Sequence, residues 1–273
     1  MDCIIPEAPS CLIKEDRGSQ TLQKIAKHLE LYKPQRVVLD GEDDQENSEQ
    51  NVGVGGSTCV ISKSCINIEE VSCTKWREKR AAVLICLFEG PEGELRVILT
   101  KRSMKLSSYP GDVALPGGKT EERDVDDSAT ALREAMEEIG LASSLVQIVA
   151  NLEPFLSQHL LKVIPVIGLI DHVEDFNPVL NADEVDAMFD VPLEMFLKKN
   201  NHRFEEREWM GWKYVVHIFD FETEKENFHI GGLTASILIQ TASVIYQQSP
   251  SFEEHQLPGF QQLQKSLLLI SNN

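Results

Sequence analysis

Apolar and polar residues alternate along this chain in patterns that predict both strands and helices. Residues 81–88 form an unbroken apolar run, and residues 95–100 form a second run rich in β-branched side chains. A Gly/Pro turn at residues 90–93 separates the runs, so they predict a β-hairpin whose first strand is covered on both faces. The same criteria predict further strands at residues 146–150 and 160–170 and a late hairpin at residues 209–221.

Three segments have the pattern of helices. Residues 19–32 carry apolar side chains at helical spacing. Residues 128–139 are rich in Ala, Leu, Glu and Met, and Gly140 is placed to end that helix. A closing helix is expected to open in the 229–235 segment and to run to about residue 246. Between the first helix and the hairpin, residues 40–56 have the acidic and then Gly-rich composition of a linker.

The helix expected at residues 128–139 has an apolar side and an acidic side. The residues of the apolar side, which would pack on a core, are Leu132, Ala135, Met136 and Ile139. Glu134, Glu137 and Glu138 fall on the opposite side at positions i, i+3 and i+4, with no Lys or Arg between them. Like charges at this spacing cost roughly 0.2–0.5 kcal/mol per pair, and a divalent cation relieves this because hard cations prefer carboxylate oxygens.

Two explanations account for these glutamates. A solvated acidic face explains the three side chains taken alone. The preceding turn at residues 115–119, however, has two glycines, whose backbone can approach a ligand or a metal closely. The glycine turn, the acidic loop and the carboxylate helix together favour a cation site.

Residues 118–141 resemble the signature box of the Nudix hydrolases. That box runs G, five residues, E, seven residues, R-E-U-x-E-E-x-G-U, where U is a bulky aliphatic residue. The matching positions are Gly118, Arg133, Glu134, Glu137, Glu138, Gly140 and Leu141. The chain departs from the box in three ways: the lone acid is Asp124 rather than Glu, eight residues separate it from the arginine, and Ala135 stands at the bulky position. Asp124 therefore corresponds to the family pattern less closely than the three glutamates do.

A second motif lies upstream of the box. Residues 99–103 (L-T-K-R-S), followed by residues 111–118 (G-D-V-A-L-P-G-G), resemble the motif of the coenzyme A diphosphatase branch of this family. Leu115 stands where that motif often has Phe, and Gly231 stands where the branch usually has Trp. The resemblance extends from about residue 77 to about residue 247.

The resemblance implies a Nudix fold, which is an α/β/α sandwich with a mixed β-sheet between helices. The domain organisation expected from it is an N-terminal extension at residues 1–75, a Nudix domain at residues 76–250 and a C-terminal tail at residues 251–273.

The chemistry implied by the family is Mg²⁺- or Mn²⁺-dependent hydrolysis of a diphosphate that is linked to another moiety. The implied metal ligands are Glu134, Glu137, Glu138 and the carbonyl oxygen of Gly118. Arg133 would orient a box glutamate through an ion pair. Either the box residue Glu137 or Glu184 would take the proton from the attacking water. Glu184 is a candidate because a glutamate precedes a V-P-L turn in the family; it would be a general base or a second metal contact, and the alternative is a glutamate at a helix start.

Three cations, Lys101, Arg102 and Lys105, stand within five residues directly before the glycine turn. They are candidates for binding the substrate's phosphates, and Arg102 is best suited to bidentate contacts. A solvated strand end is the alternative. The branch resemblance implies coenzyme A or its acyl esters as substrate, split into 3′,5′-ADP and 4′-phosphopantetheine or its acyl form.

The sequence is also compatible with other functions. If the protein is an enzyme, its substrate could instead be ADP-ribose, NADH or a guanine nucleotide, because the box does not distinguish them. A nucleotide-binding module without catalysis and an interaction protein are the alternatives outside enzymes. His159 lies in a polar turn and is a further candidate for touching substrate, although a lone loop histidine is more often structural.

Composition narrows the classes of partner. The net charge of −18 argues against a general nucleic-acid binder, and no apolar run is long enough to span a membrane. Six cysteines at irregular spacings without a C-x-x-C indicate neither a zinc site nor a disulfide framework. Residues 1–18 lack the signatures of a secretory or transit peptide, and the chain does not end in a peroxisomal tripeptide, so a cytoplasmic location is expected. The number of subunits is left open.

Overall fold

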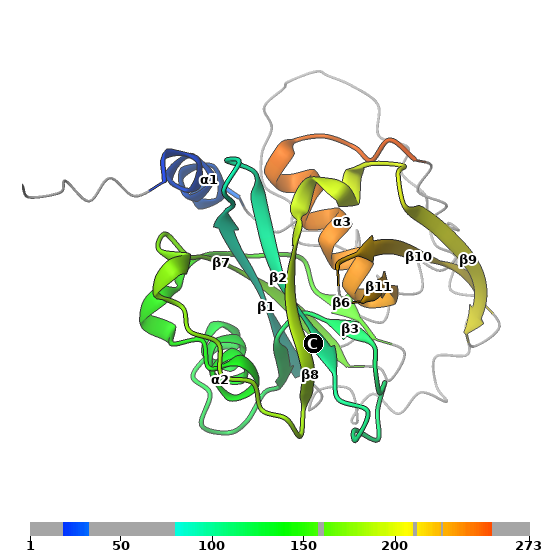
Figure 1. Cartoon of the computed structure of the whole chain (residues 1–273), viewed down its shortest axis with the longest axis horizontal. Helices are drawn as coiled ribbons and strands as arrows, with labels where there is room; N and C mark the ends of the chain where they lie inside the picture. Colours follow the sequence, from blue (N-terminus) through cyan, green and yellow to red (C-terminus); the bar gives the residue numbers. More distant parts are fainter. Residues whose placement is uncertain (1–18, 33–79, 158–160, 210–211, 225, 253–273) are drawn as a thin grey trace, which may run out of the picture.

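The computed structural model describes residues 19–32, 80–157, 161–209, 212–224 and 226–252 of the 273-residue chain (Figure 1). The α-helices are α1 (Gln20–Glu30), α2 (Asp127–Ile139) and α3 (Gly232–Tyr246). Short 3₁₀ turns lie at η3 (Ser143–Leu145), η4 (Val173–Asp175) and η5 (Leu193–Leu197). The strands are β1 (Arg80–Glu89), β2 (Leu95–Arg102), β3 (Val113–Ala114), β4 (Gly117–Lys119), β5 (Gln147–Asn151), β6 (Phe155–Leu156), β7 (Lys162–Leu169), β8 (Val185–Pro192), β9 (His202–Trp209), β10 (Trp212–Glu222) and β11 (Asn227–Gly231).

The larger sheet is mixed. Its strand order is β3-β2-β1-β7-β5, with β4 paired to β1, β6 to β7 and β8 to β2. β1 and β7 run parallel, from the pair Arg80–Lys162 to the pair Leu87–Leu169, whereas the other pairs are antiparallel. The expected hairpin of β1 and β2 is confirmed. Residues 81–88 of β1 are all apolar because successive side chains enter two different cores on opposite faces of the sheet.

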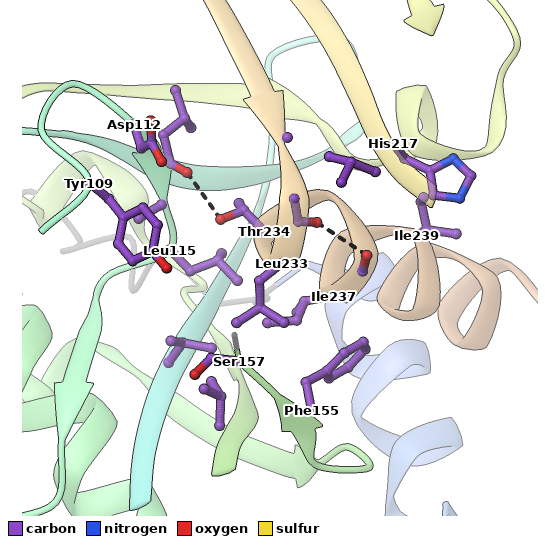
Figure 2. A pocket seen from close by; sticks show the side chains of 18 of the residues that line it. Tyr109, Asp112, Leu115, Phe155, Ser157, His217, Leu233, Thr234, Ile237 and Ile239 are labelled. Carbon is purple, nitrogen blue, oxygen red and sulfur yellow. Dashed lines mark hydrogen bonds between the residues drawn. The ribbon is translucent and has the colours of Figure 1, made fainter. Parts of the chain in front are cut away.

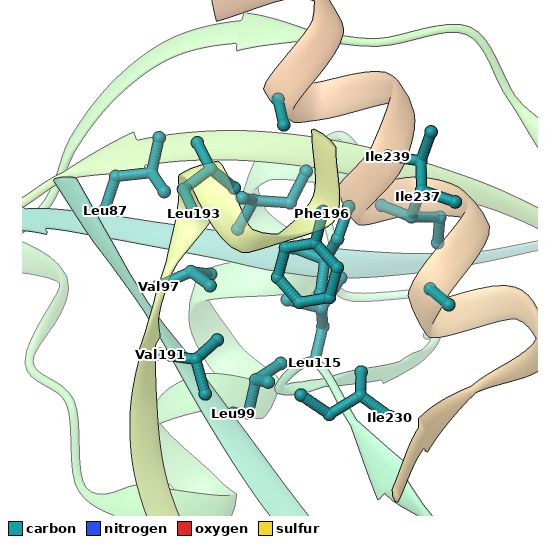
Figure 3. Close-up of a cluster of buried hydrophobic side chains, with 14 of the residues drawn as sticks. Leu87, Val97, Leu99, Leu115, Val191, Leu193, Phe196, Ile230, Ile237 and Ile239 are labelled. Atoms are coloured by element: carbon teal, nitrogen blue, oxygen red, sulfur yellow. The ribbon is translucent and has the colours of Figure 1, made fainter. Parts of the chain in front are cut away.

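Helices cover both faces of this sheet, as Figure 1 shows. On one face α2 buries Ala131, Ala135 and Ile139 against the sheet. On the other face η5, α1 and α3 form the larger core, in which Phe196 of η5 packs near Leu193, Ile230 and Ile237 (Figure 3). The expected α/β/α sandwich with a mixed sheet is therefore confirmed.

The observed bounds correct several details of the sequence prediction. Met136 was expected on the buried side of its helix, but it is 54% exposed, and Ala131 takes a place in the core instead. The late hairpin is longer than predicted, since β9 begins at His202, and together with β11 it forms a second, three-stranded sheet. His229 belongs to β11, and the closing helix begins only at Gly232.

The first helix is an integral part of the larger core. Leu22 and Leu29 are each 1% exposed and pack in the larger core together with residues of α3 and η5. The Tyr32 hydroxyl donates a hydrogen bond to Glu153, which also accepts one from Gln240 of α3. Among the described helices, none is long and apolar enough to cross a membrane.

Candidate active site

The box folds as a short strand, a loop and a helix. β4 pairs with β1, which places Gly118 opposite Ala82. The loop leads to Asp126, whose carboxylate accepts a hydrogen bond from the Ala129 N–H at 2.7 Å and caps α2. Gly140 ends the helix in the left-handed conformation with φ 73°, as the sequence predicted.

Gly117 and Gly118 are required by two close approaches. At Gly117 the φ angle is 155°, and a Cβ there would lie 2.4 Å from the carbonyl oxygen of Ala82. At Gly118 a Cβ would lie 2.5 Å from the carboxylate of Glu134. A side chain at Gly117 would meet the backbone of β1, whereas a side chain at Gly118 would have to displace the Glu134 carboxylate.

Arg133 is the centre of an ion-pair network. Its Nε and Nη2 donate to the two oxygens of Asp124 at 2.9 and 3.0 Å, and Nη2 also donates to the Lys119 carbonyl at 3.0 Å. Its Nη1 contacts Glu134 at 3.0 Å and Glu137 at 3.1 Å. The pKa of Asp124 is held far below its usual value, chiefly by these hydrogen bonds. Asp124 is thus the main partner of Arg133, a role that the sequence did not reveal.

The three box glutamates differ in exposure and contacts, and the expectation that no Lys or Arg neutralises them is wrong. Glu137 is 46% exposed and is also bound by Arg123 at 3.0 Å, so arginines do approach the acidic side of the helix. Glu138 is only 5% exposed, and its carboxylate accepts a hydrogen bond from the Gly117 N–H at 3.3 Å. Within the described ranges, no set of three Asp, Glu, His or Cys side chains is arranged to hold one ion.

Burial raises the pKa of Glu138 to about 8. The Gly117 N–H and Arg102 oppose this rise, whereas the neighbouring charges of Glu134 and Glu184 add to it. Burial likewise raises the pKa of Glu134, against the effect of Arg133. Two carboxylates with raised pKa values beside a third acid are a site where a cation would be stabilising.

Glu184 is brought to the box by backbone hydrogen bonds. The Asn181 N–H donates to the Glu138 carbonyl at 2.9 Å, and the Ser103 N–H donates to the Glu184 carbonyl at 2.8 Å. These bonds join the end of α2, the loop before β8 and the end of β2. Because Glu184 precedes strand β8, the alternative of a helix-start glutamate is wrong.

The three upstream cations separate in the fold. The ammonium of Lys101 pairs with Glu226, and that of Lys105 pairs with Asp183 at 2.9 Å and with the Ala182 carbonyl. Arg102 donates to the Ser108 carbonyl at 3.3 Å and, unlike the two lysines, lines the large cavity. Of the three candidates, Arg102 is therefore the one turned towards the space next to the box.

That cavity has a volume of about 1060 Å³ and begins at the box glycines. It extends between the larger sheet, α3 and the second sheet, as Figure 2 shows with Leu115, Phe155, Leu233 and Ile237 around its interior. Thr234 fastens the start of α3 to β3 by donating to the Val113 carbonyl at 3.0 Å. These lining residues come from distant segments with ordinary core composition, so no sequence signal marked them.

Gly231 and His159 were also singled out in the sequence, and the structure describes only Gly231. Gly231 lines the cavity, and a Cβ there would make ordinary contact with Ile218 at 3.4 Å. A large residue at this position would take up cavity space that glycine leaves open. His159 lies outside the described residues.

The sequence of this domain matches a known family. Residues 78–227, more than half of the chain, match the NUDIX domain. The chain belongs to the Nudix hydrolase family. The expected enzyme class, a hydrolase acting on diphosphate bonds, is confirmed at the level of this family.

Three curated Nudix relatives illustrate the match. The chain is 62% identical over 186 residues to "Nudix hydrolase 15, mitochondrial" of Arabidopsis thaliana; the matched stretch covers 68% of this chain and 65% of that protein, just under two thirds. It is 52% identical over 240 residues to "Nudix hydrolase 22, chloroplastic" of the same plant, a match that covers 87% of this chain and 77% of that protein. It is 39% identical over 163 residues to a peroxisomal coenzyme A diphosphatase of Mus musculus, a match that covers 59% of this chain and 68% of that protein.

The names of these relatives overturn one expectation. The cytoplasmic location expected from the sequence is wrong, because the two Arabidopsis proteins are named mitochondrial and chloroplastic. That expectation rested on the composition of the two chain ends, which carries no weight against relatives of this similarity.

Nudix hydrolases generally use divalent metal ions and act on small nucleotide derivatives. The side chains of this site fit such an ion by their chemistry. Glu134 lies against Gly118, and Glu138 lies against Gly117, so two carboxylates and a glycine turn adjoin one another. Glu138 has no ion-pair partner among the residues that the structure describes. Oxygen donors of this kind suit Mg²⁺ and Mn²⁺.

Proposed function

We propose that this protein hydrolyses the diphosphate of coenzyme A or its acyl esters, with Mg²⁺ or Mn²⁺, to 3′,5′-ADP and 4′-phosphopantetheine or its acyl form. The observation that carries the proposal is the composition of the cavity. One end has the box glycines and Arg102, and the interior is lined by apolar side chains. A substrate with a diphosphate and a long, largely uncharged arm matches both parts. The relative in Mus musculus that is named a coenzyme A diphosphatase supports the same substrate.

In this proposal Glu134, Glu137 and Glu138, together with the Gly118 carbonyl, would hold the cation, and Glu137 would have to give up its ion pair with Arg123. The chemistry that a divalent cation supplies there is neutralisation of diphosphate oxygens and activation of a bound water. Arg133 fixes Glu134 and Glu137 through its guanidinium, which is itself anchored by Asp124. Because Arg133 is fully engaged in these contacts, it is a positioning residue.

The proton of the attacking water goes to a carboxylate near the box, and Glu137 and Glu184 are the two candidates. Glu137 is exposed at the box, and Glu184 lies close enough to Glu134 and Glu138 to raise the pKa values of both. Arg102, which lines the cavity next to the box, contacts a phosphoryl oxygen and balances the charge that develops on it.

A substrate panel tests this proposal. The full chain is incubated with Mn²⁺ or Mg²⁺ and, separately, with coenzyme A, an acyl ester, ADP-ribose, NADH and GTP, and the products are identified by mass. The expected result is the highest kcat/KM on a coenzyme A species, with 3′,5′-ADP among the products. A higher kcat/KM on ADP-ribose, NADH or GTP would replace the proposed substrate and leave the hydrolase assignment intact.

Arg102 has a direct test in the same assay. Arg102→Ala is expected to lower kcat/KM on coenzyme A by about tenfold or more, because a charge-assisted hydrogen bond to a phosphate is lost. Lys105→Ala is the matched control, since Lys105 is paired with Asp183 and does not line the cavity. Equal effects of the two substitutions would remove Arg102 from the proposed phosphate contacts.

A further inference from the structure

The rim of the cavity on the second sheet carries two arginines that the proposed chemistry does not use. Arg203 and Arg207 of β9 both line the cavity, as does Glu205 between them. Residues two apart on a strand share a face, so these three side chains project from one side of β9. Their register partners on β10, Ile218, Val216 and Tyr214, also line the cavity.

The charges on this face are arranged around one carboxylate. Arg203 contacts Glu205 at 3.0 Å, and Arg207 contacts the other oxygen of Glu205 at 2.9 Å. Arg203 also contacts Asp220 at 3.4 Å, and Asp220 is shared with His229. The two arginine side chains are 46% and 51% exposed. A guanidinium has five N–H donors, so each arginine keeps donors for a ligand while Glu205 holds it at the cavity wall.

Two tyrosines, Tyr109 and Tyr214, also line the cavity. Tyr109 comes from the loop between β2 and β3 and is 44% exposed. It lies close enough to Tyr214 of β10 for the Tyr214 hydroxyl to contribute to the rise in its pKa, after burial and Asp112. Tyr109 also has a φ of 53°, a conformation that non-glycine residues rarely adopt and that is concentrated at functional sites. Figure 2 shows its ring beside the cavity near Leu115.

We propose that these four residues, Tyr109, Arg203, Arg207 and Tyr214, here called the rim cluster, bind the 3′-phosphoadenosine end of the substrate. Arg203 and Arg207 contact the 3′-phosphate, and the tyrosine rings contact the adenine. The inference rests on the proposed function, because it assumes that the diphosphate is bound at the box.

The chemistry of the cavity favours this orientation of the substrate. A phosphomonoester dianion is strongly hydrated, so it suits the half-exposed arginines at the rim rather than the apolar interior. An adenine ring has a π-face that stacks on aromatic side chains. The uncharged arm of the substrate then enters the interior around Leu233 and Ile237. A 3′-phosphate is absent from dephospho-coenzyme A, ADP-ribose and NADH, so the rim cluster would be the part of the cavity that distinguishes coenzyme A from them.

The test compares coenzyme A with dephospho-coenzyme A, which differ only in the 3′-phosphate. The wild-type protein is expected to prefer coenzyme A by about tenfold or more in kcat/KM, as for a charge-assisted pair of hydrogen bonds. Arg203→Gln with Arg207→Gln is expected to reduce that ratio to near one, by lowering turnover of coenzyme A alone. Glu205→Gln, which releases both guanidiniums from their carboxylate, is expected to increase the ratio.

Lys213→Gln is the matched control. It removes one positive charge from the opposite face of β10, where Lys213 is exposed and pairs in register with Glu208. The ratio of its kcat/KM on coenzyme A to that on dephospho-coenzyme A should equal the wild-type ratio. Thermal melting establishes that each variant is folded before its ratio is compared.

Calorimetry with 3′,5′-ADP and 5′-AMP separates this inference from the proposed function. Tighter binding of 3′,5′-ADP, lost in the double arginine variant, supports the rim cluster even if coenzyme A is not hydrolysed. Equal affinity for the two nucleotides overturns the rim cluster, and hydrolysis of coenzyme A in the same preparation would leave the proposed function standing. If the double arginine variant keeps the wild-type preference in kcat/KM for coenzyme A over dephospho-coenzyme A, the assignment to Arg203 and Arg207 is overturned.

Discussion

At the scale of single residues, the site is a set of carboxylates held in different electrostatic states. Glu138 is buried without an ion-pair partner among the described residues, and its pKa is raised to about 8. The Asp124 side chain is only 3% exposed, but it is held ionised by Arg133. Glu137 is exposed and paired with two arginines. A sequence shows three similar glutamates, and only burial and contacts distinguish them.

Replacing Glu138 by Gln should stabilise the metal-free protein at high pH. A carboxyl whose folded pKa is raised contributes stability below its unfolded pKa of 4.5 and loses it as pH rises through about 8. The Tm of the wild type in chelator should therefore fall relative to that of Glu138→Gln between about pH 5 and 9. Saturating Mn²⁺ should raise the Tm of the wild type and not that of the variant. A constant difference across this pH range would contradict the burial of an ionisable Glu138.

Breaking the ion pair of Asp124 and Arg133 should destabilise the protein at neutral pH, and this loss of stability should disappear at low pH. Asp124→Asn is expected to lower the free energy of unfolding at pH 7 by about 2–3 kcal/mol, because a guanidinium loses a buried partner. A depressed pKa contributes stability above the unfolded pKa of 3.8 and loses it as pH falls, so the difference should shrink below about pH 4 in urea titrations. Asp183→Asn, whose carboxylate is 84% exposed, should cost less than about 1 kcal/mol. Equal costs at the two positions would contradict this account.

At the scale of elements, the sequence predicted what depends on local pattern. The β1–β2 hairpin and α2 with its terminal Gly140 follow from apolar runs, caps and glycines, and the structure confirms them. The exposure of Met136 did not follow, because it depends on how α2 is rotated against the sheet. Arg123 reaches Glu137 only because the loop after β4 folds back over α2. Contacts between segments of this kind carry no signal in periodicity.

The approach of β4 to α2 should be sensitive to one added carbon. Gly118→Ala is expected to displace the Glu134 carboxylate, which lies 2.5 Å from the new Cβ position, and to weaken the stabilisation by Mn²⁺ about tenfold or more in apparent Kd. Gly231→Ala is the matched control, because its Cβ has ordinary contacts only. Thermal shift titrations with Mn²⁺ measure both variants. An unchanged Mn²⁺ response in Gly118→Ala would remove Glu134 from the ligand set.

At the scale of the whole molecule, α1 and the Nudix domain share one core. Leu22 and Leu29 are buried with residues of α3 and η5, so the helix contributes to the stability of the domain that carries the site. Leu29→Ala should lower the free energy of unfolding by about 2–4 kcal/mol, whereas Leu31→Ala, which is 82% exposed, should change it by less than about 0.5 kcal/mol. Urea denaturation measures both. Equal small effects would mean that α1 does not pack on the domain in solution.

The central claim for the whole molecule is that buried box carboxylates serve metal-dependent cleavage of coenzyme A. The most direct measurement is the rate of 3′,5′-ADP formation from coenzyme A with and without Mn²⁺, for the wild type, Glu138→Gln and the surface control Glu122→Gln. We predict metal-dependent product with the wild type and the control, and at least about a hundredfold slower formation with Glu138→Gln. Product formation by Glu138→Gln at the wild-type rate, or by the wild type in the presence of chelator, would contradict the account.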